Sequence, residues 1–169
     1  GTPIPNEDIV ESAVPYLPTW PGLAGIYKAP TLPLPEALLN NIDLIITGNP
    51  GTGKTIALAY IASCIARREA EFGTLKDSVP FYVHVANLDL PVDEEKGIQA
   101  IIKLASERVT PHDLSRIPEF VRNTFLAGRA ILLLDGTDEL TADGIKGIGE
   151  FIRQIKHAYP TTRIVTTGS

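Results

Sequence analysis

The sequence of 169 residues has no methionine, one tryptophan and a single cysteine, Cys64. One cysteine cannot form an intramolecular disulfide, which is typical of a protein kept in a reducing compartment. Cys64 shares a helical spacing with Ala57, Ile61 and Ile65, so we expect its thiol to fill part of a buried helix face. The three histidines are far apart in the sequence, without the close pairing typical of a metal site, and we assign no zinc.

The sequence also lacks an excess of basic residues and long apolar runs. Its formal net charge is −5, and no stripe of lysine and arginine is visible, so nonspecific nucleic-acid binding is not expected. No apolar run approaches the roughly 20 residues that a bilayer span requires, and the first residues do not resemble a secretory signal. We therefore predict a cytoplasmic protein without a membrane or nucleic-acid partner.

Composition is that of a folded domain, with 44% apolar and 21% charged residues. Eight of the fourteen prolines fall within the first 35 residues, interleaved with Tyr16, Trp20 and Tyr27. Such a segment cannot be mainly helical. We predict that residues 1–40 form an arm packed on the core, with a short helix near 7–13, and that residues 41–169 form the core. An alternative is that residues 25–28 border a nucleotide base. Because the chain begins at Gly1 and has no methionine, we expect a processed chain or a piece of a longer protein.

Beyond residue 40, strand and helix signals alternate, which predicts an α/β fold with a parallel sheet between two helical layers. The expected strands are 42–47, 81–85, 130–134 and 163–167, and the expected helices are 56–72, 98–109, 114–125 and 145–155. In such a fold the carboxyl ends of the strands meet along one edge of the sheet, where ligands bind.

A glycine-rich loop follows the first predicted strand and opens the first predicted helix. It consists of Gly48, Asn49, Pro50, Gly51, Thr52, Gly53, Lys54 and Thr55, with Ile56 beginning the helix. Backbone N–H groups in such a loop surround a polyphosphate, and glycines let them approach it. Lys54 offers a positive charge to the β and γ phosphates, and Thr55 offers a hydroxyl to Mg²⁺. The loop therefore predicts a P-loop NTPase core that binds a nucleoside triphosphate.

An acidic segment follows the third predicted strand, in the sequence I-L-L-L-D-G-T-D-E-L of residues 131–140. Asp135, at the end of a buried strand, is placed to reach Mg²⁺. Asp138 and Glu139 follow the turn and are candidates to orient or deprotonate the attacking water, as phosphoryl transfer requires. Thr166 and Thr167 end the fourth strand, and we expect one of them to hydrogen-bond the γ-phosphate or that water.

These residues resemble the NACHT branch of the STAND NTPases, relatives of the AAA+ ATPases. The resemblance spans about 43–168 and depends on G-N-P-G-T-G-K-T, V-P-F-Y-V-H-V-A-N-L and, above all, the spaced acids of G-R-A-I-L-L-L-D-G-T-D-E-L. It implies the metal role for Asp135 and the water-activating role for Asp138 or Glu139. The sequence departs from the family pattern at Gly168, where the family often has a sensor arginine.

The resemblance also implies a sheet order of 5-1-4-3-2, of which this sequence contains four strands. The fifth strand, the helical lid and the winged-helix region of such proteins are not in the sequence. Residues 44–46 would then lie on an exposed edge, and we predict that the chain self-associates there or that its proline-rich arm covers the edge.

The function implied is Mg²⁺-dependent binding and slow hydrolysis of a nucleoside triphosphate, with ATP favoured over GTP by resemblance alone. The chain would act as the nucleotide switch and oligomerisation module of a larger signalling or innate-immune defence protein, in contact with that protein's other domains. One alternative is an AAA+ remodeller or helicase loader, for which Arg153 and Arg163 are available as arginine fingers. Another is a scaffold that binds nucleotide without catalysis. A small-molecule kinase is disfavoured, because Arg67 and Arg68 fall within the predicted helix 56–72 and not in a lid.

Overall fold

The computed structural model describes residues 33–39, 43–93 and 96–168. The predicted arm of residues 1–32, with its short helix at 7–13 and the suggested base contact at 25–28, lies outside the described residues. Helix α3 (Leu34–Leu39) is described, and it buries Leu34 and Leu38 against the core. In the described ranges, no helix is both long and apolar enough to cross a bilayer.

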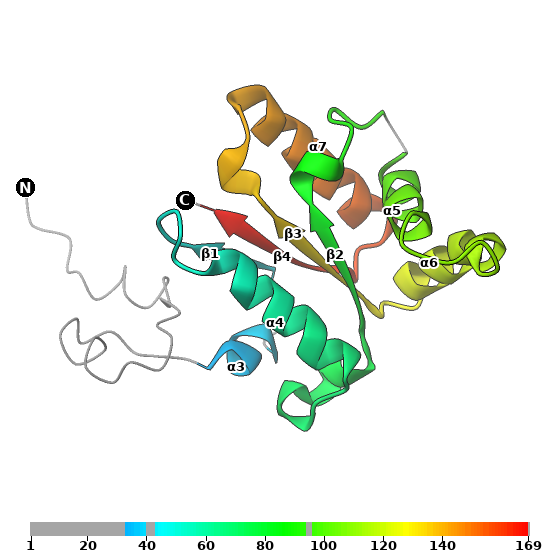
Figure 1. Cartoon of the computed structure of the whole chain (residues 1–169), viewed down its shortest axis with the longest axis horizontal. Helices are drawn as coiled ribbons and strands as arrows, with labels where there is room; N and C mark the ends of the chain where they lie inside the picture. The colour runs from blue at the N-terminus through cyan, green and yellow to red at the C-terminus, as the bar shows by residue number, and fades with distance from the viewer. Residues whose placement is uncertain (1–32, 40–42, 94–95, 169) are drawn as a thin grey trace, which may run out of the picture.

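The sheet contains four parallel strands, as the alternating pattern predicts (Figure 1). They are β1 (Leu44–Thr47), β2 (Val79–His84), β3 (Ala130–Asp135) and β4 (Arg163–Gly168), and they lie in the order β1-β4-β3-β2. This matches the 1-4-3-2 part of the expected order. All four carboxyl ends therefore meet at one edge, which also holds the loop from β1 to the next helix.

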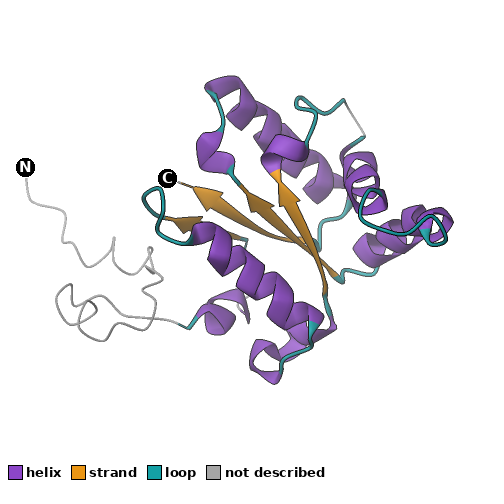
Figure 2. Cartoon of the chain, in the orientation of Figure 1, coloured by secondary structure: helices purple, strands orange, loops and turns teal. Residues whose placement is uncertain are grey.

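Helices cover both faces of the sheet, which gives the three layers seen in Figure 2. On one face lie α4 (Lys54–Ala66), α3 and the 3₁₀ segment η1 (Ala70–Asp77). On the other face lie α5 (Gly97–Ser106), α6 (Ile117–Leu126) and α7 (Ala142–Ala158). Short 3₁₀ turns follow strands or precede helices at η2 (Val85–Asn87), η3 (Leu114–Arg116) and η4 (Thr137–Glu139).

The central strand β3 is buried along its whole length. Ile131 and Leu133 pack in the cluster with α4, whereas Leu132 and Leu134 pack in the cluster with α5, α6 and α7. Because side chains alternate between faces along a strand, Asp135 lies on the α4 face, at the carboxyl edge. Cys64 is buried in the α4 cluster, which confirms its predicted core position.

The helix predicted over 56–72 is wrong at its end, because α4 stops at Ala66. The N–H of Arg68 donates to the Ile65 carbonyl at 2.9 Å, and the N–H of Glu69 donates to the Cys64 carbonyl at 3.0 Å. This is a Schellman C-cap, with Arg68 in the left-handed region at φ 57°. Arg67 and Arg68 thus lie just after the end of α4. The end was not predicted because the left-handed cap residue is an arginine and not the usual glycine.

Other predicted boundaries are corrected as well. The helix predicted over 114–125 begins with the separate turn η3, and Leu114 is exposed. The strand predicted over 81–85 begins at Val79 and ends at His84, with Pro80 inside it. Proline is tolerated there because β2 is an edge strand of the described sheet. Asp135, expected just after its strand, is the last residue of β3. The helix predicted over 98–109 corresponds to α5, which ends at Ser106, and the helix predicted over 145–155 lies within the longer α7.

Candidate nucleotide-binding site

The glycine-rich loop lies between β1 and α4, with the helix beginning at Lys54. Gly51 and Gly53 have φ values of 80° and 90°, in the left-handed region that glycine adopts without strain. Gly48 is required for another reason, since a Cβ there would stand 2.6 Å from the Thr52 hydroxyl oxygen. That hydroxyl donates to the Asn49 carbonyl at 2.8 Å and closes the loop. The loop leads directly into the N-terminus of α4, and helix N-termini are favourable positions for anions.

Lys54 folds back over this loop and is nearly buried. Its Nζ donates to the carbonyl oxygens of Gly48 at 2.5 Å and Asn49 at 3.2 Å. It also forms an ion pair with Asp138 at 3.0 Å, in which the two side chains are 8% and 18% exposed. The hydrogen bond from Lys54 holds the pKa of Asp138 below its usual range. The loop lysine and the acid after β3, separate in the sequence, therefore share one site.

Asp135 is the centre of a hydrogen-bond network and is 2% exposed. Its Oδ1 accepts from the Gly136 N–H at 2.9 Å, the Thr55 hydroxyl at 3.2 Å and the Thr167 hydroxyl at 3.5 Å. Its Oδ2 accepts from the Tyr82 hydroxyl at 2.5 Å. Donors therefore hold both oxygens of the Asp135 carboxylate.

The turn after Asp135 is held by β2 and β4. Gly136 has a φ of 81°, and a Cβ there would stand 2.5 Å from Cε1 of His84. The Gly136 N–H also donates to the Thr167 hydroxyl at 3.2 Å, and the Thr137 hydroxyl donates to the Thr167 carbonyl. Glycine in the D-G-x-D-E segment is therefore required by conformation and by the neighbouring ring.

The structure brings most of the predicted residues together, but they differ in their hydrogen-bond partners and in their exposure. Thr167 belongs to the Asp135 network, whereas the Thr166 hydroxyl donates to the Thr167 carbonyl at 3.3 Å. Glu139 is exposed, and no described side chain pairs with its carboxylate. Ile56 is also exposed, at the start of α4.

Sequence reasoning missed Tyr82 and His84, which reach the site from β2. A signal was present in the alternation of V-P-F-Y-V-H. Phe81 and Val83 belong to the core on the α5 side, so Tyr82 and His84 fall on the α4 face together with Asp135. The expected strand order placed β2 beside β3, but it did not give their register, in which His84 lies opposite Asp135.

The site fits a magnesium ion by its chemistry. Thr55 and Asp135 present a hydroxyl and a carboxylate oxygen 3.2 Å apart, and hard oxygen ligands are those that Mg²⁺ prefers. These two residues would hold the ion beside the phosphates. When bound, Mg²⁺ neutralises charge on the β and γ phosphate oxygens.

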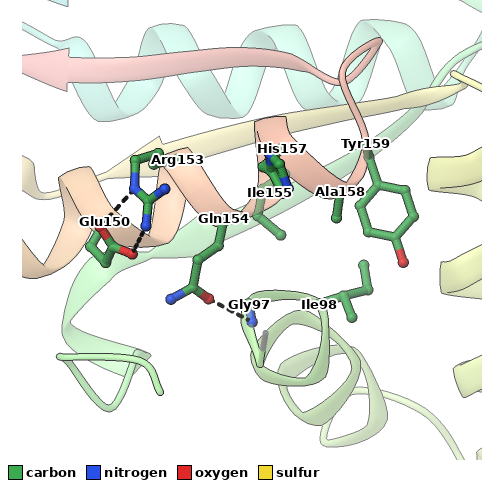
Figure 3. Close-up of a pocket in the computed structure, with 9 residues that line it drawn as sticks. All are labelled: Gly97, Ile98, Glu150, Arg153, Gln154, Ile155, His157, Ala158 and Tyr159. Atoms are coloured by element: carbon green, nitrogen blue, oxygen red, sulfur yellow. Dashed lines mark hydrogen bonds and ion pairs between the residues drawn. The ribbon is translucent and has the colours of Figure 1, made fainter. Parts of the chain in front are cut away.

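The two arginines considered as fingers lie elsewhere. Arg153, on α7, pairs with Glu150 at 2.5 Å beside a cavity of about 480 Å³ between α5 and α7 (Figure 3). In that cavity Gln154 accepts a hydrogen bond from the Gly97 N–H at 3.1 Å. Arg163 begins β4, and its Nη1 donates to the Leu38 carbonyl at 3.2 Å, at the amino end of the strand. Neither arginine reaches the phosphate loop of its own chain.

Comparison with known proteins agrees with this geometry. The NACHT domain family matches residues 43–163. The chain is also similar to the tRNA modification GTPase MnmE of two Haemophilus influenzae strains, PittEE and 86-028NP. Each is 27% identical over 130 residues, covering 74% of this chain and 26% of the relative. The chain thus spans about a quarter of the length of these relatives. With a glycine-rich loop, a buried acid opposite it and a match over most of its length, the chain belongs to the NACHT family of P-loop NTPases.

Proposed function

We propose that this chain binds a magnesium-complexed nucleoside triphosphate and hydrolyses it slowly, as the nucleotide switch of a larger signalling or defence protein. One observation carries the proposal. At the start of α4, Lys54 contacts Asp138 of η4 at 3.0 Å, and Thr55 contacts Asp135 at the end of β3 at 3.2 Å. Positive charge, a hydroxyl, a carboxylate and open backbone N–H groups are the groups that phosphoryl transfer uses for positioning.

The contacts of Asp138 and Glu139 support different roles for these two acids, whose roles the sequence left open. The Asp138 carboxylate is paired with Lys54, at 3.0 Å from its Nζ. Glu139 follows it on an exposed turn and has no described partner. We assign water activation to Glu139 and the positioning of Lys54 to Asp138.

Lys54→Ala tests the binding half of the proposal. Charge-assisted hydrogen bonds contribute about 1.5–3 kcal/mol, so triphosphate affinity measured by calorimetry should fall by about 10- to 100-fold or more. Lys76→Ala, at an exposed lysine of η1, is the matched control and should bind like the parent.

Glu139→Gln tests the catalytic half. Removing a general base costs about 10²- to 10⁴-fold in rate, while the glutamine keeps the size of the side chain. Triphosphate binding should persist and single-turnover hydrolysis should fall by at least about 100-fold. Equal loss of binding in Glu139→Gln and Lys54→Ala would show that the carboxylate roles are misassigned.

We propose ATP as the nucleotide, because of the resemblance to the NACHT family. GTP is the second candidate, supported by the similarity to a protein named as a tRNA modification GTPase. Competition of unlabelled ATP and GTP against a fluorescent triphosphate decides between them. Oligomerisation and tight retention of diphosphate would favour the switch, whereas stimulated multiple turnover would favour an AAA+ remodeller.

A further inference from the structure

Tyr82 is a residue of β2 whose hydroxyl reaches the buried acid of the neighbouring strand. In the β2–β3 register Tyr82 lies opposite Leu133, two residues before Asp135. The side chains of Tyr82 and Asp135 are both on the α4 face, so the phenol extends along the sheet toward the carboxyl edge. Its hydroxyl donates to Asp135 Oδ2 at 2.5 Å. The ring packs against the α4 core, which limits its rotation.

The two oxygens of Asp135 have different partners. The donors Thr55, Thr167 and the Gly136 N–H converge on Oδ1. Among the described residues, the Tyr82 hydroxyl is the donor at Oδ2. A carboxylate held at one oxygen alone can still rotate about its Cβ–Cγ bond, whereas one held at both oxygens has a fixed plane. Tyr82 therefore completes the orientation of Asp135.

The Tyr82 hydroxyl is a neutral donor, so it orients the carboxylate without placing a second charge beside it. Donors to a metal-binding carboxylate commonly set metal affinity in this way.

We propose that the Tyr82 hydroxyl is a positioning group that orients Asp135 toward the magnesium–nucleotide complex, and that it thereby sets the magnesium affinity of the site. The inference rests on the proposed function of the loop. It adds to that function a residue from β2, outside the glycine-rich loop and the acidic segment.

The test is the magnesium dependence of nucleotide binding in Tyr82→Phe. A fluorescent triphosphate is titrated first in EDTA and then at fixed concentration with increasing Mg²⁺. Loss of such a second partner typically costs about 10- to 100-fold in metal affinity. The Mg²⁺ concentration at half-saturation should therefore rise at least about tenfold, while affinity in EDTA should change less than about twofold.

Tyr60→Phe is the matched control, since it also removes a phenol hydroxyl beside a carboxylate. Tyr60 lies on α4, where its hydroxyl donates to Glu71 at 3.0 Å on the exposed side. This variant should keep the parent's Mg²⁺ half-saturation.

Two outcomes would overturn the role of Tyr82, and a third would overturn the proposed function. An unchanged Mg²⁺ half-saturation in a folded Tyr82→Phe protein would show that the hydroxyl does not set metal affinity. A variant that loses its circular dichroism spectrum would show that the hydroxyl supports folding and does not tune the site. A parent that binds no triphosphate at all would overturn the proposed function itself, which separates that failure from the failure of Tyr82.

Discussion

Lys54 and Asp138 form an ion pair inside the candidate site. Lys54 is almost fully buried and would be unfavourable there without an anion, because burial disfavours an isolated charge. Asp138 and two loop carbonyls supply the partners. We expect a phosphate bound in the loop to compete with Asp138 for Lys54.

The pair predicts a pH dependence with a definite sign. The pKa of Asp138 is lowered by Lys54, so the pairing contributes stability above about pH 4, the ordinary range of an aspartate, and loses it as pH falls through the lowered pKa. Carboxyl carbon NMR should show an aspartate that titrates below its usual range. In Lys54→Met that resonance should titrate at higher pH.

Asp93 serves as the internal reference for this experiment, because its pKa is lowered by Lys96, a partner that Lys54→Met leaves in place. Its titration should be the same in both proteins. If Asp138 titrates alike in the parent and in Lys54→Met, the ion pair does not persist in solution.

Helix α7 contains three glycines, although glycine is unfavourable inside a helix. Gly147 packs closely on the chain before α5, where a Cβ would lie 3.2 Å from Leu90 Cβ. Gly149 has nothing within 4 Å of its Cβ position and faces solvent. The helix still forms because Ile148, Phe151 and Ile155 are buried along its core face. Packing outweighs propensity here.

The two glycines predict opposite responses to alanine. Gly149→Ala should raise the free energy of unfolding by about 0.5–1 kcal/mol, the helix-propensity difference, with no contact disturbed. Gly147→Ala should lose that gain, since overpacking typically costs about 1–3 kcal/mol. Urea unfolding of both variants measures the difference, and a larger stability for Gly147→Ala would contradict the packing described for α7.

At the scale of the whole molecule, the two edges of the described sheet differ. On the β2 edge the Arg108 guanidinium donates to the Tyr82 carbonyl at 3.0 Å and occupies an otherwise free acceptor. On the β1 edge Ile45 is 67% exposed. An open apolar edge is a template for pairing with another strand.

We therefore retain the prediction that the chain self-associates through β1 or that its proline-rich arm covers this edge. A lysine on an edge strand opposes pairing, so Ile45→Lys should weaken self-association at least about tenfold in a sedimentation series. Leu126→Lys, at a residue of α6 that is 69% exposed, is the control and should have no effect. A monomeric parent whose β1 amides exchange freely would defeat both options.

Much of the core followed from local patterns. The apolar run of β3 predicted a strand buried on both faces. The isoleucine spacing within 145–155 predicted the helix α7, in which Ile148 and Ile155 are buried but Ile145 is 56% exposed. The end of α4 was missed because Arg68 adopts a left-handed conformation that usually identifies a glycine or asparagine. The start of β2 was missed because proline normally argues against a strand, and only the edge position permits it.

The sequence by itself determined the chemistry of the loop and of the acidic segment, because phosphate and cation binding require particular residue types at short, fixed spacings. It also determined the alternation of strands and helices, which depends on local periodicity. The tertiary structure decided which residues meet across the sheet. Three contacts depend on the register of the strands. They are the ion pair between Asp138 and Lys54 and the hydrogen bonds that Asp135 accepts from Thr167 and Tyr82. Pairing between distant strands arises from packing of the whole core, which no local pattern encodes.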